Sequence, residues 1–105
     1  MAWLLLFVAG LLEIVWAYTM KLSEGFTRPA ASIVTLAAMI ASFTLLSFSM
    51  RTLPLGTAYT VWTGIGAVGA FVVGIVVLGE SMHAGRILAA VLILSGILMM
   101  KASSG

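Results

Sequence analysis

The stretch that decides the fold is AWLLLFVAGLLEIVWAYTM, residues 2–20, in which Glu13 is the one charged side chain. A helix needs about 20 mainly apolar residues to cross the hydrocarbon core of a bilayer, and this stretch is close to that length. Residues 30–50, 52–79 and 87–100 carry no charged side chain at all. We therefore predict an all-α integral membrane protein, one domain over residues 1–105, with transmembrane helices at approximately residues 2–20, 30–50, 54–78 and 84–102.

The composition excludes an ordinary water-soluble domain. The chain has 105 residues, of which 63% are hydrophobic and 8% charged, whereas soluble domains carry about 25% charged residues. Cysteine is absent and His83 is the only histidine, so we expect no disulfide framework, no metal site and no cofactor. The charged residues form no basic patch, so we expect no nucleic-acid partner.

The fourth predicted span is the shortest, because only 14 residues separate Arg86 from Lys101. Both side chains can extend to the membrane interfaces and so lengthen the span; for Lys101 we favour such an anchoring role. The first span has one alternative interpretation, a cleaved signal sequence. That alternative is disfavoured because the stretch lacks a charged leading region and carries Glu13 in its middle.

The connections give little preference for one orientation in the membrane. Lys21, Arg28 and Arg86 fall on one side, and Arg51 and Lys101 fall on the other. Orientation normally follows such an imbalance of Lys and Arg, and here it is nearly absent. We hypothesise that the chain inserts both ways and pairs as an antiparallel homodimer. Two opposed copies would also supply the inverted repeat from which many transporters are built.

Glu13 is the residue on which function is expected to depend. A charged side chain at the middle of a span costs about 2.5–3.5 kcal/mol on insertion scales, and burial penalises the ionised form. A proton and a cation therefore compete for such a carboxylate. The alternative is a structural Glu paired with a Lys or Arg of another helix, but no other span of this chain has a charge in its middle.

Helical spacing places further polar and aromatic residues on shared faces. Gly10, Trp16 and Ala17 share the face of Glu13, where the two small residues are expected to leave room and Trp16 to add a wall and an indole donor. In the third span, a single face carries Tyr59, Trp62, Thr63 and Gly66.

Aromatic rings beside a carboxylate suit a cation, although plain helix packing explains the same spacing. In the second span, Met39 and Ser42 share a face. Ser42 is expected either to donate to Glu13 or to bond to its own backbone.

The glycine pattern indicates packing and bending. Residues 64–69 match G-x-G-x-x-G, but that pattern binds dinucleotides only between a strand and a helix, so we reject that interpretation. Gly64 and Gly66 instead predict a bend in the third helix. The fourth span carries small and branched residues on one face, which predict contact between two copies: Ala89, Ile93, Gly96 and Ile97.

Taken together, these residues resemble the small multidrug resistance family along nearly the whole chain. The resemblance is carried by Glu13, by Lys21 with residues 23–28, and by the run Pro54–Gly66. Within the family, the chain is similar to the guanidinium exporter subtype at Trp16, Met39, Thr57 and Lys101. It departs from common family patterns at Thr60 and at Ala89, where alanine and glycine are respectively frequent.

The resemblance implies a transporter and not an enzyme. It implies an antiparallel homodimer in the bacterial inner membrane that exports guanidinium in exchange for protons. The site would then be formed by Glu13 of both copies with Trp16, Ser42, Tyr59 and Trp62. The alternative within the family is a promiscuous exporter of quaternary ammonium ions, and the alternatives outside it are a channel and a regulatory membrane peptide.

Overall fold

Four helices make up the computed structural model, which describes residues 1–103. They are α1 (Ala2–Leu22), α2 (Pro29–Ser49), α3 (Leu55–Val76) and α4 (Ala84–Ser103). Each helix is long enough and apolar enough to cross a membrane, which confirms the predicted number and class. The chain is thus an all-α, multi-pass membrane protein over its described residues.

Proline and left-handed backbone set the helix ends. Pro29 occupies the first turn of α2 and Pro54 caps α3, positions where the missing amide hydrogen costs nothing. After α1, Ser23 accepts a bond from the Phe26 amide at 3.1 Å and donates to the Met20 carbonyl at 2.7 Å. The chain then reverses through Gly25, whose φ of 75° favours glycine.

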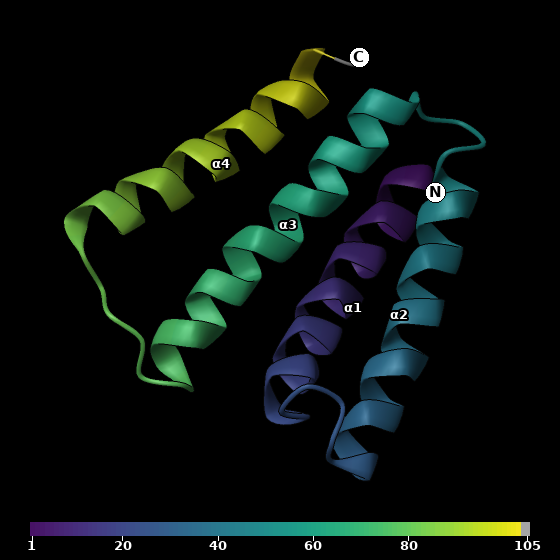
Figure 1. Ribbon diagram of the computed structural model, residues 1–105. Coiled ribbons are helices and arrows are strands. Elements are labelled where there is room, and N and C mark those ends of the chain that lie inside the picture. Colours follow the sequence, from purple (N-terminus) through teal and green to yellow (C-terminus); the bar gives the residue numbers. More distant parts are fainter. Residues whose placement is uncertain (104–105) are drawn as a thin grey trace.

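The helices are arranged unevenly (Figure 1). Helix α1 packs along both α2 and α3, whereas α4 runs beside α3 and meets α1 near its C-terminal end, where Lys101 lies over Trp3. The buried core lies where α1, α2 and α3 meet and consists of Leu6, Ala9, Leu46, Ala58, Val61 and Trp62. Within α4, by contrast, none of the residues is buried. The fourth helix is therefore the least supported part of the bundle.

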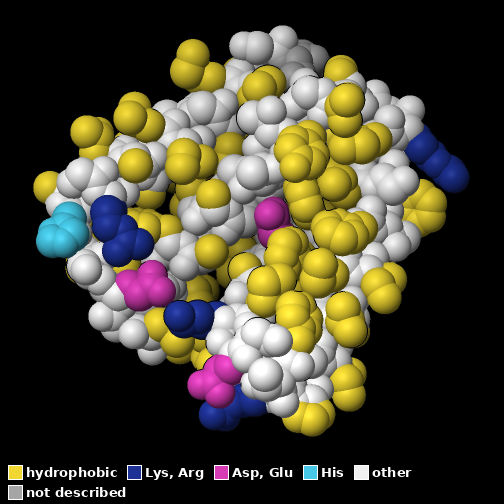
Figure 2. Space-filling view, in the orientation of Figure 1, with side chains coloured by type: hydrophobic (Ala, Val, Ile, Leu, Met, Phe, Trp, Pro, Cys, Tyr) yellow, Lys and Arg dark blue, Asp and Glu magenta, His cyan; other side chains and the backbone are white. Residues whose placement is uncertain are grey.

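The outer surface is largely apolar. The arrangement is flat, with a shortest dimension of 16 Å across the Cα atoms, so one chain cannot cover its own apolar side chains. Hydrophobic side chains are spread over the face shown in Figure 2, and Lys, Arg and Glu side chains gather at its lower left. Lipid or a second chain must cover the remainder, because contiguous apolar surface of this extent is not stable in water.

Candidate functional site

Glu13 points from α1 onto the backbone of α3. Its carboxyl group packs directly against Gly66, where a Cβ atom would overlap it. The oxygen Oε1 is buried and has no hydrogen-bonding partner among residues 1–103. A buried acceptor without a partner costs about 1–3 kcal/mol, so this position is maintained at a cost in stability. The carboxyl group therefore lacks a donor, which residues 1–103 do not supply.

Trp16, one turn further along α1, has the complementary feature. Its indole Nε1 is also buried without a partner among the described residues, and an indole can only donate. The space beside Glu13 was predicted to come from the small residues Gly10 and Ala17, but another residue provides it. The space over Gly10 is filled by Ile65, which a Cβ there would approach to 2.6 Å. It is Gly66, and not Gly10, that makes room for the carboxyl group.

Ser42 connects three helices through its hydroxyl group. The hydroxyl donates to the Ala9 carbonyl of α1 at 2.7 Å and accepts the indole N–H of Trp62 from α3 at 3.0 Å. The prediction that Ser42 bonds either to Glu13 or to the backbone of its own helix was therefore wrong. The reason is geometric: Ser42 is fully buried where α2 crosses α1 one turn before the carboxylate. Its role in the structure is to fix the orientation of the Trp62 ring.

Four aromatic rings form a row beside the site. Trp16 meets Phe43 edge-on at 6.2 Å between ring centroids, Phe43 meets Trp62 at 5.8 Å, and Trp62 meets Tyr59 at 5.6 Å. The prediction omitted Phe43, although it lies one turn after Met39 on α2 and so shares its face. A row of rings on one side of a carboxylate provides π-faces that attract cations.

The residues predicted to share one face of α3 point in two different directions. Trp62 is buried toward α1 and α2, and Gly66 faces Glu13. Tyr59 is 53% exposed and, with Thr63, lines a cavity of about 510 Å³ between α3 and α4. Within one chain, Thr63 is therefore not brought to Glu13. Met39 is partly buried on α2.

The face predicted to join two copies is partly used inside one chain. Ile97 packs on Gly64, where a Cβ would come within 2.7 Å of Cδ1, and Ile93 lies next to it. Both line the α3–α4 cavity together with Gly96, whereas Ala89 lines a smaller cavity near Arg86. A Cβ at Gly96 would meet no heavy atom within 4 Å. Gly64 and Gly66 thus act first as close-contact points, and α3 is continuous across both.

Comparison with known sequences places these features in a family. The family model described as Small Multidrug Resistance protein matches residues 1–93. The chain belongs to the small multidrug resistance family. It is 57% identical over 104 residues to a guanidinium exporter of Citrobacter freundii, covering 99% of each chain.

Two further relatives with the same name are similar over comparable lengths. A guanidinium exporter of Yersinia pestis is 57% identical over 99% of this chain and 100% of its own, and one of Salmonella typhimurium strain LT2 is 53% identical over 99% of both. The family match ends within α4, but the alignments with these relatives cover 104 residues of the chain and so include all of α4. In this member of the family, the Lys101 ammonium lies 5.0 Å from the centroid of the Trp3 ring and so ties the end of α4 to α1.

Proposed function

We propose that the protein exports guanidinium across the bacterial inner membrane in exchange for protons, as an antiparallel homodimer with one Glu13 from each copy at the site. The single observation that carries the proposal is a buried pair of groups on one helix face, the acceptor Oε1 of Glu13 and the donor Nε1 of Trp16, neither with a partner among the described residues. The names of the relatives support guanidinium as the ion.

The exchange follows from the chemistry of a carboxylate. Ionised Glu13 attracts a cation, and planar guanidinium can make two parallel hydrogen bonds to a carboxylate. Protonation removes the charge and one acceptor, so that the cation leaves. Two Glu13 carboxylates in a dimer permit one cation to be exchanged for up to two protons. Trp16 would donate to the carboxylate pair, and alternating access would use a bend of α3 at Gly64 and Gly66.

A second copy is supported by what one chain leaves uncovered. Helix α4 has no buried residue, and the end of the aromatic row at Tyr59 is half exposed. An antiparallel copy would cover this side and add a second carboxylate. The near balance of Lys and Arg between the two sides allows both orientations. A C-terminal tag that is accessible from one side of the membrane only would contradict this arrangement.

The family description favours one alternative, a multidrug exporter, for which we consider quaternary ammonium ions as the substrates. Such ions carry no N–H donor, so they would leave Oε1 of Glu13 without a hydrogen bond. Phe43 also lies against both Trp16 and Trp62, so a cation that contacts these rings would meet a closely packed row. Both features favour a small cation with N–H groups.

Transport by reconstituted protein tests the proposal. Wild-type protein in liposomes is expected to move protons when guanidinium is added on one side, and Glu13→Gln is expected to abolish that movement. Glu24→Gln is the matched control, because Glu24 is an exposed acid in the loop after α1. Guanidinium uptake that survives Glu13→Gln, or that is independent of the proton gradient, would refute the mechanism. Proton movement driven by tetraethylammonium instead of guanidinium would support the alternative.

A further inference from the structure

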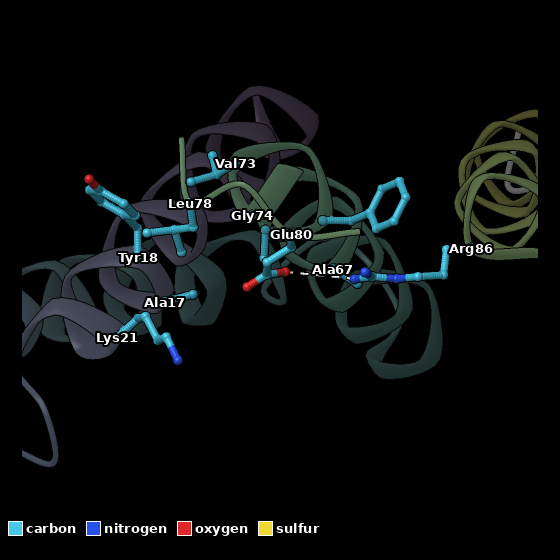
Figure 3. Close-up of a pocket in the computed structure, with 11 residues that line it drawn as sticks. Ala17, Tyr18, Lys21, Ala67, Val73, Gly74, Leu78, Glu80 and Arg86 are labelled. Carbon is cyan, nitrogen blue, oxygen red and sulfur yellow. Dashed lines mark ion pairs between the residues drawn. The ribbon is translucent and has the colours of Figure 1, made fainter. Parts of the chain in front are cut away.

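A further cavity, with four polar side chains in its lining, opens at the end of the bundle where α1 ends and α4 begins. It has a volume of about 370 Å³ and is lined by α1, α3, α4 and the segment between α3 and α4 (Figure 3). Its polar side chains are Tyr18, Lys21, Glu80 and Arg86. None of these residues has a role in the exchange proposed above, so the cavity calls for its own explanation.

Glu80 is held in this cavity by its own backbone. Its amide donates to the Gly74 carbonyl at 2.9 Å, and its carboxylate rests on the Cα of Gly74, where a Cβ would overlap it. Gly74 is buried in the last turns of α3. The missing side chain at residue 74 therefore seats an acid at the cavity wall, in the same way that Gly66 seats Glu13.

Arg86 faces this acid loosely. Its Nη2 lies 3.7 Å from Oε1 of Glu80, and both side chains are about two-fifths exposed, at 40% and 42%. Arg86 has two other contacts, a 2.7 Å hydrogen bond from Nη1 to the Ser81 carbonyl and a position 5.1 Å from the centroid of the Phe71 ring. Because these contacts hold the Arg86 side chain independently of Glu80, Arg86 can lose its ion pair with Glu80 without becoming disordered.

The inner end of the cavity approaches Glu13. Ala17 and Ala67 line it there. Ala17 lies one helical turn after Glu13 on α1, and Ala67 follows Gly66, against which the Glu13 carboxyl group packs. The cavity thus runs from the exposed loops to within about one helical turn of the buried carboxylate, which does not itself line it.

We propose that Glu80 is an outer binding site for a guanidinium-type cation, which replaces the chemically identical head group of Arg86 on its way to or from Glu13. The inference rests on the proposed function. When substrate is absent, the Arg86 guanidinium pairs with the Glu80 carboxylate. When a cation is bound there, the positive charges of Lys21 and Arg86 repel it and lower its affinity, so that it can leave for Glu13 or for the solution. Binding of an anion is disfavoured because Glu80 projects into the cavity between the two basic side chains (Figure 3).

Substitution of Glu80 and of Arg86 distinguishes a cation-binding site from an ion pair that only stabilises the loop. Glu80→Gln removes the acceptor and is expected to raise the KM for guanidinium about three- to fivefold, the size of a half-exposed charge pair, with little change in maximal rate. Arg86→Gln removes the internal competitor and is expected to lower that KM. The double variant should behave as Glu80→Gln. The control pair is Glu24→Gln and Arg28→Gln, whose exposed 2.9 Å ion pair lies outside the cavity and whose loss should leave KM unchanged.

The inference is tested by whether the KM for guanidinium rises in Glu80→Gln and falls in Arg86→Gln. If the Glu80–Arg86 pair only fastens the loop, both substitutions break the same contact and KM shifts the same way or not at all, which overturns the inference. Failure of the proposed function looks different: wild-type protein would then show no guanidinium-driven proton movement, or Glu13→Gln would retain it. Measuring initial rates over a range of guanidinium concentrations in liposomes provides all of these comparisons.

Discussion

Gly66→Ala is the substitution that tests the site most directly. A Cβ at residue 66 would lie 2.7 Å from Cγ of Glu13 and closer still to its carboxyl group, whereas carbon atoms in contact prefer about 3.5–4.0 Å. The Glu13 side chain must therefore retreat by about 1 Å or α1 and α3 must separate. Overpacking of this kind costs about 1–3 kcal/mol.

That cost is expected at the carboxylate itself, so transport should suffer more than folding. Converted to a rate, about 1–3 kcal/mol corresponds to a reduction of about 5- to 150-fold in guanidinium-driven proton movement at low substrate. Gly85→Ala provides the control, because residue 85 lies in α4, outside the predicted site and dimer contact, and a Cβ there would meet no heavy atom within 4 Å. Both substitutions replace a helical glycine and so raise helix propensity, which the comparison takes into account.

The assay is proton flux in liposomes at equal protein content, with detergent-solubilised protein checked for folding by far-ultraviolet circular dichroism. Gly66→Ala should retain its helical signal and lose most of its flux, and Gly85→Ala should retain both. If Gly66→Ala transports within twofold of Gly85→Ala, the contact between residue 66 and the carboxylate has no functional role and the reasoning fails.

Two further predictions concern the support of the aromatic row. Ser42→Ala leaves the Trp62 indole without its acceptor, so thermal unfolding in detergent should show destabilisation by about 1–3 kcal/mol together with a higher KM for guanidinium; unchanged stability would contradict the bond at 3.0 Å. Phe43→Leu removes the ring between Trp16 and Trp62 and should increase transport of alkylated guanidiniums relative to guanidinium itself, as competition assays would show; an unchanged ratio would mean that Phe43 does not limit substrate size.

The architecture was predictable because the bilayer imposes a simple constraint on sequence. Each span must be about 20 apolar residues long, and the few charged residues mark its ends. Four such stretches gave four helices. Even the shortest stretch, between Arg86 and Lys101, forms a helix from Ala84 to Ser103, since long basic side chains can reach the interface from inside the last turns.

Contacts between helices were less predictable, because residue spacing fixes a face but not what that face meets. Gly10 was predicted to make room for Glu13, and Gly66 was predicted to bend the third helix. The rotation of α3 decides otherwise, because it places Ile65 over Gly10 and leaves Gly66 beneath the carboxyl group. The same rotation turns Thr63 toward α4 while Trp62 is buried toward α2.

Phe43 and Glu80 were overlooked for a related reason. A phenylalanine in an apolar span resembles a side chain that faces lipid, and an acid in a loop resembles a solvated charge. Only tertiary contacts distinguish them, the two ring contacts of Phe43 and the seat of Glu80 on Gly74. Ser42 shows the converse: its place in an apolar span indicated a bonded hydroxyl, but its partners, Ala9 and Trp62, lie on two other helices.

The two glycines of α3 suggest how events at Glu13 reach the rest of the molecule. Gly66 contacts the carboxyl group of Glu13 on α1, and Gly64 contacts Ile97 on α4. Residues two apart lie about 200° apart around a helix, so the two contacts are on nearly opposite sides of α3. No side chain of α3 lies within either contact. In the exchange proposed above, a shift of the Glu13 carboxyl group toward α3 would therefore bear directly on the α3 backbone, which rests on α4, the helix with the least support in one chain.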